Sequence, residues 1–328
     1  MSKNIVIIGD SPLSSLIACQ LDRQLAREAH IEITHISRDE SFVYLPCLTS
    51  LIGQYHLPAK KELYQEVTFT KATIRQINLI DRRVITTAGT YEYDVLVIDQ
   101  TPTFTGLEIK KISALCLRLV TQLQSKIKSG HQLKARLTFA GDDVSSWQLA
   151  LALAGDVSKL SSGLRRSLVI QAQFPLWDWL KKFLSDNSVE SRKTVGLLPG
   201  ATVAGAKPPF ENRLVRGALL DDADNFILDP SLNPERYPEV IVVDRIKRFY
   251  QNNLRVDQTL AVKISQNISR YLEGRRQQTI ELPPMSGLLR TDENMAAWVG
   301  GLQDKRFKAR IIGRLDLAFY RRLFRLHS

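Results

Sequence analysis

A continuous apolar strand that ends at a glycine and leads into a helix constrains the fold of this chain more than any other feature. Residues 5–8 are all apolar, Gly9 ends the run, and residues 13–21 carry apolar side chains at helical spacing. A second apolar strand follows at residues 31–36. Strand, helix and strand in this order form a βαβ unit, in which the two strands are parallel. The sequence therefore predicts an α/β fold with a parallel sheet.

The same order returns in the second half of the chain. Residues 137–140 are largely apolar, Gly141 ends the run, and residues 147–154 have the pattern of a helix. Other segments with the pattern of strands or helices lie at residues 72–79, 83–87, 93–98, 167–171, 176–184, 240–243 and 254–272. A chain of 328 residues is long for one domain. We therefore expect two α/β domains.

Each of the two turns keeps one glycine where a dinucleotide-binding turn has three. The motif G-x-G-x-x-G lets the backbone approach a pyrophosphate at a helix N-terminus. The first turn reads Gly9-Asp10-Ser11-Pro12-Leu13-Ser14, and the second reads Gly141-Asp142-Asp143-Val144-Ser145-Ser146. Taken alone, either sequence also fits an ordinary strand-to-helix turn capped by Ser or Asp.

Several short segments, in order along the chain, resemble the type II NADH dehydrogenases. The clearest is Tyr237-Pro238-Glu239-Val240-Ile241-Val242-Val243-Asp244, which is similar to the family's Y-P-x-I-F-A-x-G-D but has Val243 in place of the glycine. Segments that resemble other phrases of the family lie at residues 36–42, 44–48, 93–99, 146–150, 205–210 and 228–232. The resemblance extends from about residue 4 nearly to the C-terminus.

The resemblance implies two Rossmann-like folds, with an FAD-type domain interrupted by an NAD-type domain. It places the FAD-type domain at residues 1–109 and 216–280, a shortened NAD-type domain at 110–215, and a C-terminal amphipathic helical tail for membrane-surface binding or dimerisation at 281–328. The activity that it implies is electron transfer from NAD(P)H through FAD to a membrane quinone. The cofactor-binding residues that it implies are Gly9, Ser11, Ser14, Arg38, Asp244 and Gly141.

These cofactor positions depart from the family pattern. Ser37 stands where the family has an acidic residue for the FAD ribose, and losing such a charge-assisted hydrogen bond costs about 1.5–3 kcal/mol. Asp10 adds a negative charge near the FAD pyrophosphate, and Asp142 and Asp143 do so where the phosphates of NADH would lie. Arg38 could supply a compensating cation. We expect FAD binding to be weak or lost, and we expect NADH not to bind.

No other pattern indicates a catalytic or metal site. The three cysteines, Cys19, Cys47 and Cys116, lack the C-x-x-C spacing of metal sites and redox pairs. The histidines have no spaced partners for a metal, and nothing resembles a Ser-His-Asp triad. His35 lies within a predicted strand and is interpreted as structural.

The C-terminal segment combines positive charge with an apolar stripe. Residues 305–328 contain eight Lys or Arg residues and one acidic residue, a balance of +7 out of the chain's +11. The apolar stripe and its flanking arginines predict a helix that lies in a membrane interface. The residues assigned to membrane binding are Phe307, Arg310, Ile311, Arg314, Leu315, Phe319 and Leu323. A solvated basic helix that packs on the protein's own core is the alternative.

Charge and composition restrict the partners. The net charge of +11 favours an anionic partner, and the apolar stripe favours an anionic membrane surface over nucleic acid. No stretch reaches the roughly 18 apolar residues of a spanning helix, and the first residues lack the pattern of a signal peptide. We expect a cytoplasmic protein, peripheral on the inner face of a membrane, either as a homodimer or with a different partner protein.

Two functions follow from these observations. The first is an active flavin oxidoreductase that passes electrons from NAD(P)H to a membrane quinone. The second is a non-catalytic descendant that serves as a scaffold or partner subunit. The altered phosphate-binding turns favour the second.

Overall fold

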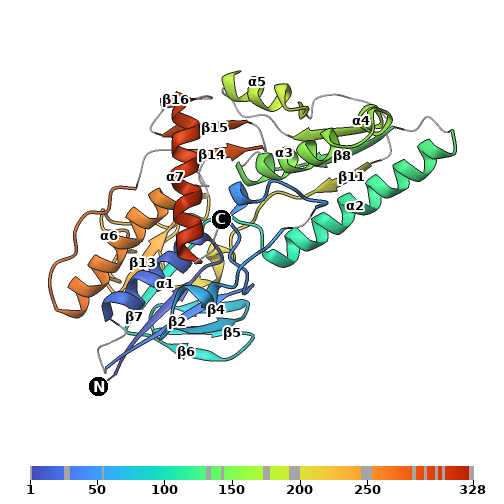
Figure 1. Ribbon diagram of the computed structural model, residues 1–328. Helices are drawn as coiled ribbons and strands as arrows, with labels where there is room; N and C mark the ends of the chain where they lie inside the picture. Colours follow the sequence, from blue (N-terminus) through green and yellow to red (C-terminus); the bar gives the residue numbers. More distant parts are fainter. Residues whose placement is uncertain are drawn as a thin grey trace.

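The computed structural model describes the chain except residues 1, 26–29, 54, 131–133, 142–143, 173–177, 192–199, 245–252, 283–285, 292–293, 300–301, 305–306 and 325–328. Two α/β units, each with its own parallel sheet, are joined by a C-terminal portion that contacts both (Figure 1). The predicted fold class is confirmed.

The first unit contains a five-stranded parallel sheet in the order β13-β7-β1-β2-β3. Its strands alternate their apolar side chains between two cores. One face packs against α1 and α6, which also pack against each other. The bounds are β1 Lys3–Ile8, β2 Ile31–Ser37, β3 Thr68–Lys71, β7 Val95–Asp99, β13 Val240–Val243, α1 Pro12–Leu25 and α6 Leu254–Leu272.

A mixed sheet covers the other face of the first sheet. Its order is β12-β4-β5-β6, and it shares a hydrophobic core with β1, β7 and β13. The strands are β4 Ile74–Asn78, β5 Arg83–Thr86, β6 Thr90–Glu92 and β12 Val215–Arg216. Short 3-10 helices lie at Leu45–Cys47, Lys60–Leu63 and Asn212–Leu214.

The second unit contains a four-stranded parallel sheet in the order β10-β9-β8-β11. Helix α3 is buried almost throughout and packs on β8 and β9, while α2 packs against α4. The bounds are α2 Gly106–Lys128, β8 Ala135–Phe139, α3 Val144–Ser158, α4 Ser162–Ser167, β9 Leu168–Ala172, α5 Asp178–Asp186, β10 Glu190–Ser191 and β11 Gly200–Val203.

The C-terminal portion consists of an antiparallel sheet and a long helix. The sheet has the order β14-β15-β16, with β14 Ser286–Arg290, β15 Met295–Val299 and β16 Leu302–Asp304. Helix α7, Phe307–Leu323, packs on β15 through Gly313, where an added Cβ atom would lie 1.9 Å from the Met295 sulfur. Figure 1 shows α7 standing between the two units.

Candidate functional site

The parallel sheet of the first unit brings most of the predicted cofactor residues to one edge. Gly9 and Ser11 lie in the turn from β1 to α1, and Ser14 lies in the first turn of α1. Arg38 follows β2, and Asp244 follows β13. All three strands are parallel, so these residues lie at the carboxyl ends of the strands, where ligands of α/β sheets bind. Gly141 follows β8 in the other sheet and belongs to the second unit.

The N-terminus of α1 holds a carboxylate of the protein itself. Asp99, the last residue of β7, is fully buried. Its carboxylate accepts hydrogen bonds from the Ser14 backbone N–H at 3.1 Å, from the Thr101 backbone N–H at 3.0 Å and from the Ser11 hydroxyl. A negative group at this point interacts favourably with the helix dipole. This is the point at which a dinucleotide fold binds pyrophosphate.

A buried ion network fills the neighbouring space between the β1–α1 turn and β2. The Asp10 carboxylate pairs with the Arg38 guanidinium and accepts hydrogen bonds from the Ser37 hydroxyl at 2.7 Å and the Arg38 backbone N–H at 2.8 Å. Lys60, only 1% exposed, donates to the Ser37 hydroxyl at 2.5 Å and to the Asp39 carbonyl at 3.0 Å. This network occupies the place where the resemblance puts the FAD ribose.

The charges in this network depend on one another. Burial alone would raise the pKa of Asp10, but the charges of Lys60 and Arg38, with hydrogen bonds from Ser37 and Arg38, hold that pKa below its ordinary value. Burial lowers the pKa of Lys60 to about 8, although Asp10 and Asp39 oppose this shift. The lysine therefore stays charged at neutral pH and compensates the buried carboxylates.

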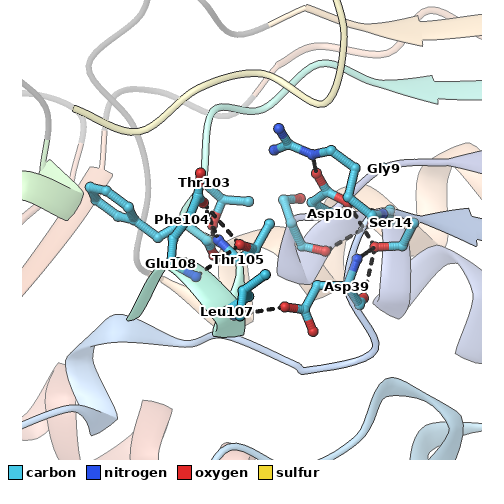
Figure 2. Close-up of polar contacts among 12 residues, drawn as sticks. Gly9, Asp10, Ser14, Asp39, Thr103, Phe104, Thr105, Leu107 and Glu108 are labelled. Atoms are coloured by element: carbon cyan, nitrogen blue, oxygen red, sulfur yellow. Dashed lines mark hydrogen bonds and ion pairs between the residues drawn. The ribbon is translucent and has the colours of Figure 1, made fainter. Parts of the chain in front are cut away.

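Asp39 connects this network to α2. Its carboxylate accepts a hydrogen bond from the Leu107 backbone N–H, in the first turn of α2, at 2.8 Å, and another from the Ser41 backbone N–H at 2.8 Å. Figure 2 shows Asp39 between the loop of Gly9 and Asp10 and the segment from Thr103 to Glu108. Burial would raise the pKa of Asp39, but the hydrogen bonds from Ser41 and Leu107 lower it overall.

His35 contacts the backbone of the turn before α1, as expected of a structural residue. One ring nitrogen lies 3.0 Å from the Tyr64 hydroxyl, and the other lies 3.1 Å from the Gly9 carbonyl oxygen. Burial and the charge of Lys60 lower the pKa of His35 to about 3. The ring is therefore neutral at physiological pH.

Helix α6 also receives a carboxylate, from the C-terminal helix. Asp316 of α7 is fully buried and accepts a hydrogen bond from the Arg255 backbone N–H, in the first turn of α6, at 3.2 Å. Burial raises the pKa of Asp316 to about 7. Tyr320 of α7 and Phe324, which directly follows the helix, pack against Phe42 of the first unit.

Several polar donors at this edge bind carboxylates of the protein itself. Asp99 uses the backbone and hydroxyl donors of the β1–α1 turn, and Asp10 uses those of Ser37 and Arg38. Two carboxylates therefore lie at the edge where the resemblance places the pyrophosphate and ribose of FAD. An added Cβ atom at Gly9 would lie 2.8 Å from the Asp99 Cβ, so this glycine makes room for the protein's own side chain.

In the second unit, Gly141 follows β8 at the end of that strand. Asp142 and Asp143, on which the expectation about NADH rests, lie outside the described residues. Gln148 of α3 is buried and pairs with the backbone of Arg290 in β14, donating to its carbonyl at 2.7 Å and accepting from its N–H at 2.8 Å. The segment at 146–150, part of the family resemblance, thus joins the second unit to the C-terminal sheet.

The predicted membrane-binding residues divide between two environments. Arg310, Ile311, Arg314 and Leu315 are exposed, whereas Phe319 and Leu323 are half-buried against the core of the first unit. The side chain of Phe307 lies outside the described residues. Helix α7 docks through a neighbouring face formed by Ala309, Gly313, Asp316 and Tyr320, and Phe324 continues this buried face just after the helix. None of the described helices has the length and apolar character required to span a bilayer.

The structure adds three residues that the sequence interpretation missed: Asp99, Lys60 and Asp316. Only Asp99 left a signal, because a charged residue ends an otherwise apolar strand where the family phrase has alanine. Within the described part of the chain, no group of three His, Cys, Asp or Glu side chains could hold a metal ion.

Comparison with known proteins places the fold. No protein-family model and no curated protein sequence matches the chain. The sulfide:quinone oxidoreductase of Aquifex aeolicus is similar with a TM-score of 0.68 and 14% identity, over 99% of this chain and 92% of that one. A chain of the Tetrahymena thermophila mitochondrial ATP synthase is similar with a TM-score of 0.62 and 12% identity, over 97% and 93%. An NAD-dependent persulfide reductase from A. fulgidus is similar with a TM-score of 0.56 and 13% identity, over 90% and 63%.

These similarities show the architecture of oxidoreductases with two dinucleotide-binding domains. At such identities they show the fold alone. The more specific resemblance to type II NADH dehydrogenases stays a prediction.

Proposed function

We propose that this chain is a non-catalytic protein with the fold of the two-domain flavoprotein oxidoreductases, and that it acts as a scaffold or partner subunit at a membrane surface. The observation that carries the proposal is the pair of buried carboxylates, Asp99 and Asp10, at the edge where the cofactor's phosphates and ribose would bind.

The magnitude of the electrostatic conflict supports the loss of FAD. Two like charges about 4 Å apart repel by about 4 kcal/mol at the effective dielectric constant of a protein. A pyrophosphate placed at the N-terminus of α1 would meet Asp99 there, and Asp10 beside it. A repulsion of that size weakens binding by about three orders of magnitude. Since the second turn carries Asp142 and Asp143, we expect NADH not to bind either.

The comparison with the ATP synthase chain supports a role within an assembly. That chain belongs to a mitochondrial ATP synthase tetramer and has this fold over 93% of its length. A chain of this architecture can therefore be a component of a larger complex. A separate observation, the positive charge, indicates the kind of partner. We propose that the net charge of +11 and the exposed basic face of α7 direct this protein to an anionic membrane surface or to a protein partner.

A visible absorption spectrum tests the loss of flavin. The protein is purified without denaturation, its spectrum is recorded, and FAD is then added and the unbound fraction removed by gel filtration. We expect no flavin absorption before or after the addition. A flavin band near one equivalent in either spectrum would instead support the alternative function, an active flavin oxidoreductase acting between NAD(P)H and a quinone.

A further inference from the structure

Three helix N-termini in this protein each receive an aspartate from a distant part of the chain. Asp99 binds the first turn of α1, Asp39 binds the first turn of α2, and Asp316 binds the first turn of α6. The contacts to the backbone N–H groups measure 3.1, 2.8 and 3.2 Å. The donors and partial positive charge that a helix N-terminus offers to an anion are thus used internally.

Asp99 is bound on several sides and is fully buried. It receives two backbone N–H groups and one hydroxyl, from Ser14, Thr101 and Ser11, and it has no exposed surface. Three donors around one carboxylate, two of them from the β1–α1 region, reproduce the way such turns bind an oxyanion. The side chain also lies against Gly9, which leaves it the room to reach these donors.

We propose that Asp99 is a built-in ligand, whose carboxylate replaces the anionic group of a bound molecule at α1 and so maintains the site without a cofactor. The inference rests on the proposed function and deepens it. The proposal implies a latent oxyanion site at the N-terminus of α1. This site becomes available when the Asp99 carboxylate is removed, as in Asp99→Ala.

Inorganic phosphate is the probe for this latent site. Urea unfolding of Asp99→Ala is measured with increasing phosphate, against sodium chloride of equal ionic strength. We expect phosphate to lower the equilibrium constant for unfolding of this variant about tenfold. This effect is expected when the phosphate concentration is about ten times the dissociation constant of the complex between phosphate and the variant. The wild type, in which the carboxylate fills the site, should respond no more than it does to chloride.

Two further variants serve as controls. Asp94, at the opposite end of β7, also accepts a backbone N–H, from Asn4 at 2.8 Å, but it touches no helix N-terminus in the described contacts. Asp94→Ala should therefore lose stability without gaining a phosphate response. Asp99→Asn keeps the volume of the side chain, so it should also show no response.

A phosphate response in Asp99→Ala alone supports the proposal. A response that is absent from Asp99→Ala, or equal in Asp94→Ala, overturns it. If Asp99→Ala does not fold in chloride, refolding in phosphate decides the question: recovery supports the built-in ligand, and failure to recover contradicts it. Flavin bound to the wild type would contradict the proposed function, whereas a missing phosphate response in a flavin-free protein contradicts only this inference.

Discussion

At the scale of single residues, Lys60 is the side chain on which the buried network depends. Its positive charge compensates the negative charges of Asp10 and Asp39, and its side chain is only 1% exposed. Lys60→Met should therefore destabilise the protein by about 3–5 kcal/mol, because it leaves buried carboxylates without their cation. The adjacent Lys61 is exposed, and Lys61→Met should change stability by less than about 0.5 kcal/mol. Urea unfolding of the two variants makes the comparison, and equal losses would show that Lys60 does not neutralise the network.

Asp316 should make stability depend on pH. Its pKa in the folded protein is about 7, above the ordinary 3.8. The folded state thus binds the proton of the Asp316 carboxyl more tightly than the unfolded state does. The resulting contribution to the free energy of unfolding is complete below pH 3.8 and is lost as the pH rises through 7. Asp316→Asn should therefore gain stability over the wild type between pH 5 and pH 8, by at most about 3 kcal/mol. The urea midpoints of the wild type and Asp316→Asn at pH 5 and pH 8 test this. If the difference between the two midpoints is the same at both pH values, Asp316 is ionised at both.

Single residues also show what the sequence can and cannot predict about the site. Gly9, Ser11, Ser14, Arg38 and Asp244 were predicted to bind a cofactor; they lie at the carboxyl edge of one sheet, and their role in binding stays a prediction. Their partners were not predictable, because Asp99 contacts Ser14 across 85 residues of sequence and Lys60 contacts Ser37 across 23. The local sequence indicates which hydrogen-bond donors the turn offers. Only the folded structure determines which acceptor binds them.

At the scale of elements, α7 is predicted to hold the protein to an anionic membrane. Truncating it is a poor test, because Tyr320 and Phe324 belong to the core. Ile311 and Leu315 are 41% and 47% exposed, so Ile311→Asp with Leu315→Asp should remove most binding to vesicles that contain anionic lipid. Leu219 and Ile227 have similar exposure, 47% and 48%, and their Asp variants are the matched control. Equal sedimentation of both double variants with the vesicles would contradict the role of α7.

Elements with a strong apolar period were predicted well, and those defined by distant contacts were not. The strands at 5–8, 31–36 and 240–243 and the helix at 254–272 agree with the structure. Helix α2, the longest, was overlooked, although Thr105 and Glu108 form a capping box before its apolar stripe. The sheet β14-β15-β16 has short strands beside α7, and its pairing depends on tertiary packing more than on local pattern.

At the scale of the whole molecule, the two units and the C-terminal helix hold one another through polar side chains placed at helix ends and strand edges. Asp39 connects the first unit to α2, Gln148 connects the second unit to β14, and Asp316 connects α7 to α6. Asp156 of α3 adds a further connection, since it accepts the backbone N–H groups of Leu51 and Ile52. Contacts within the chain thus hold the two units and the C-terminal portion together.

A crystal structure of the wild-type protein grown or soaked with ADP shows which group binds the N-terminus of α1. We expect electron density for the Asp99 carboxylate within hydrogen-bonding distance of the Ser14 backbone N–H and the Ser11 hydroxyl, with no nucleotide phosphate at the N-terminus of α1. A pyrophosphate bound there, with Asp99 rotated away from Ser14, would contradict this expectation.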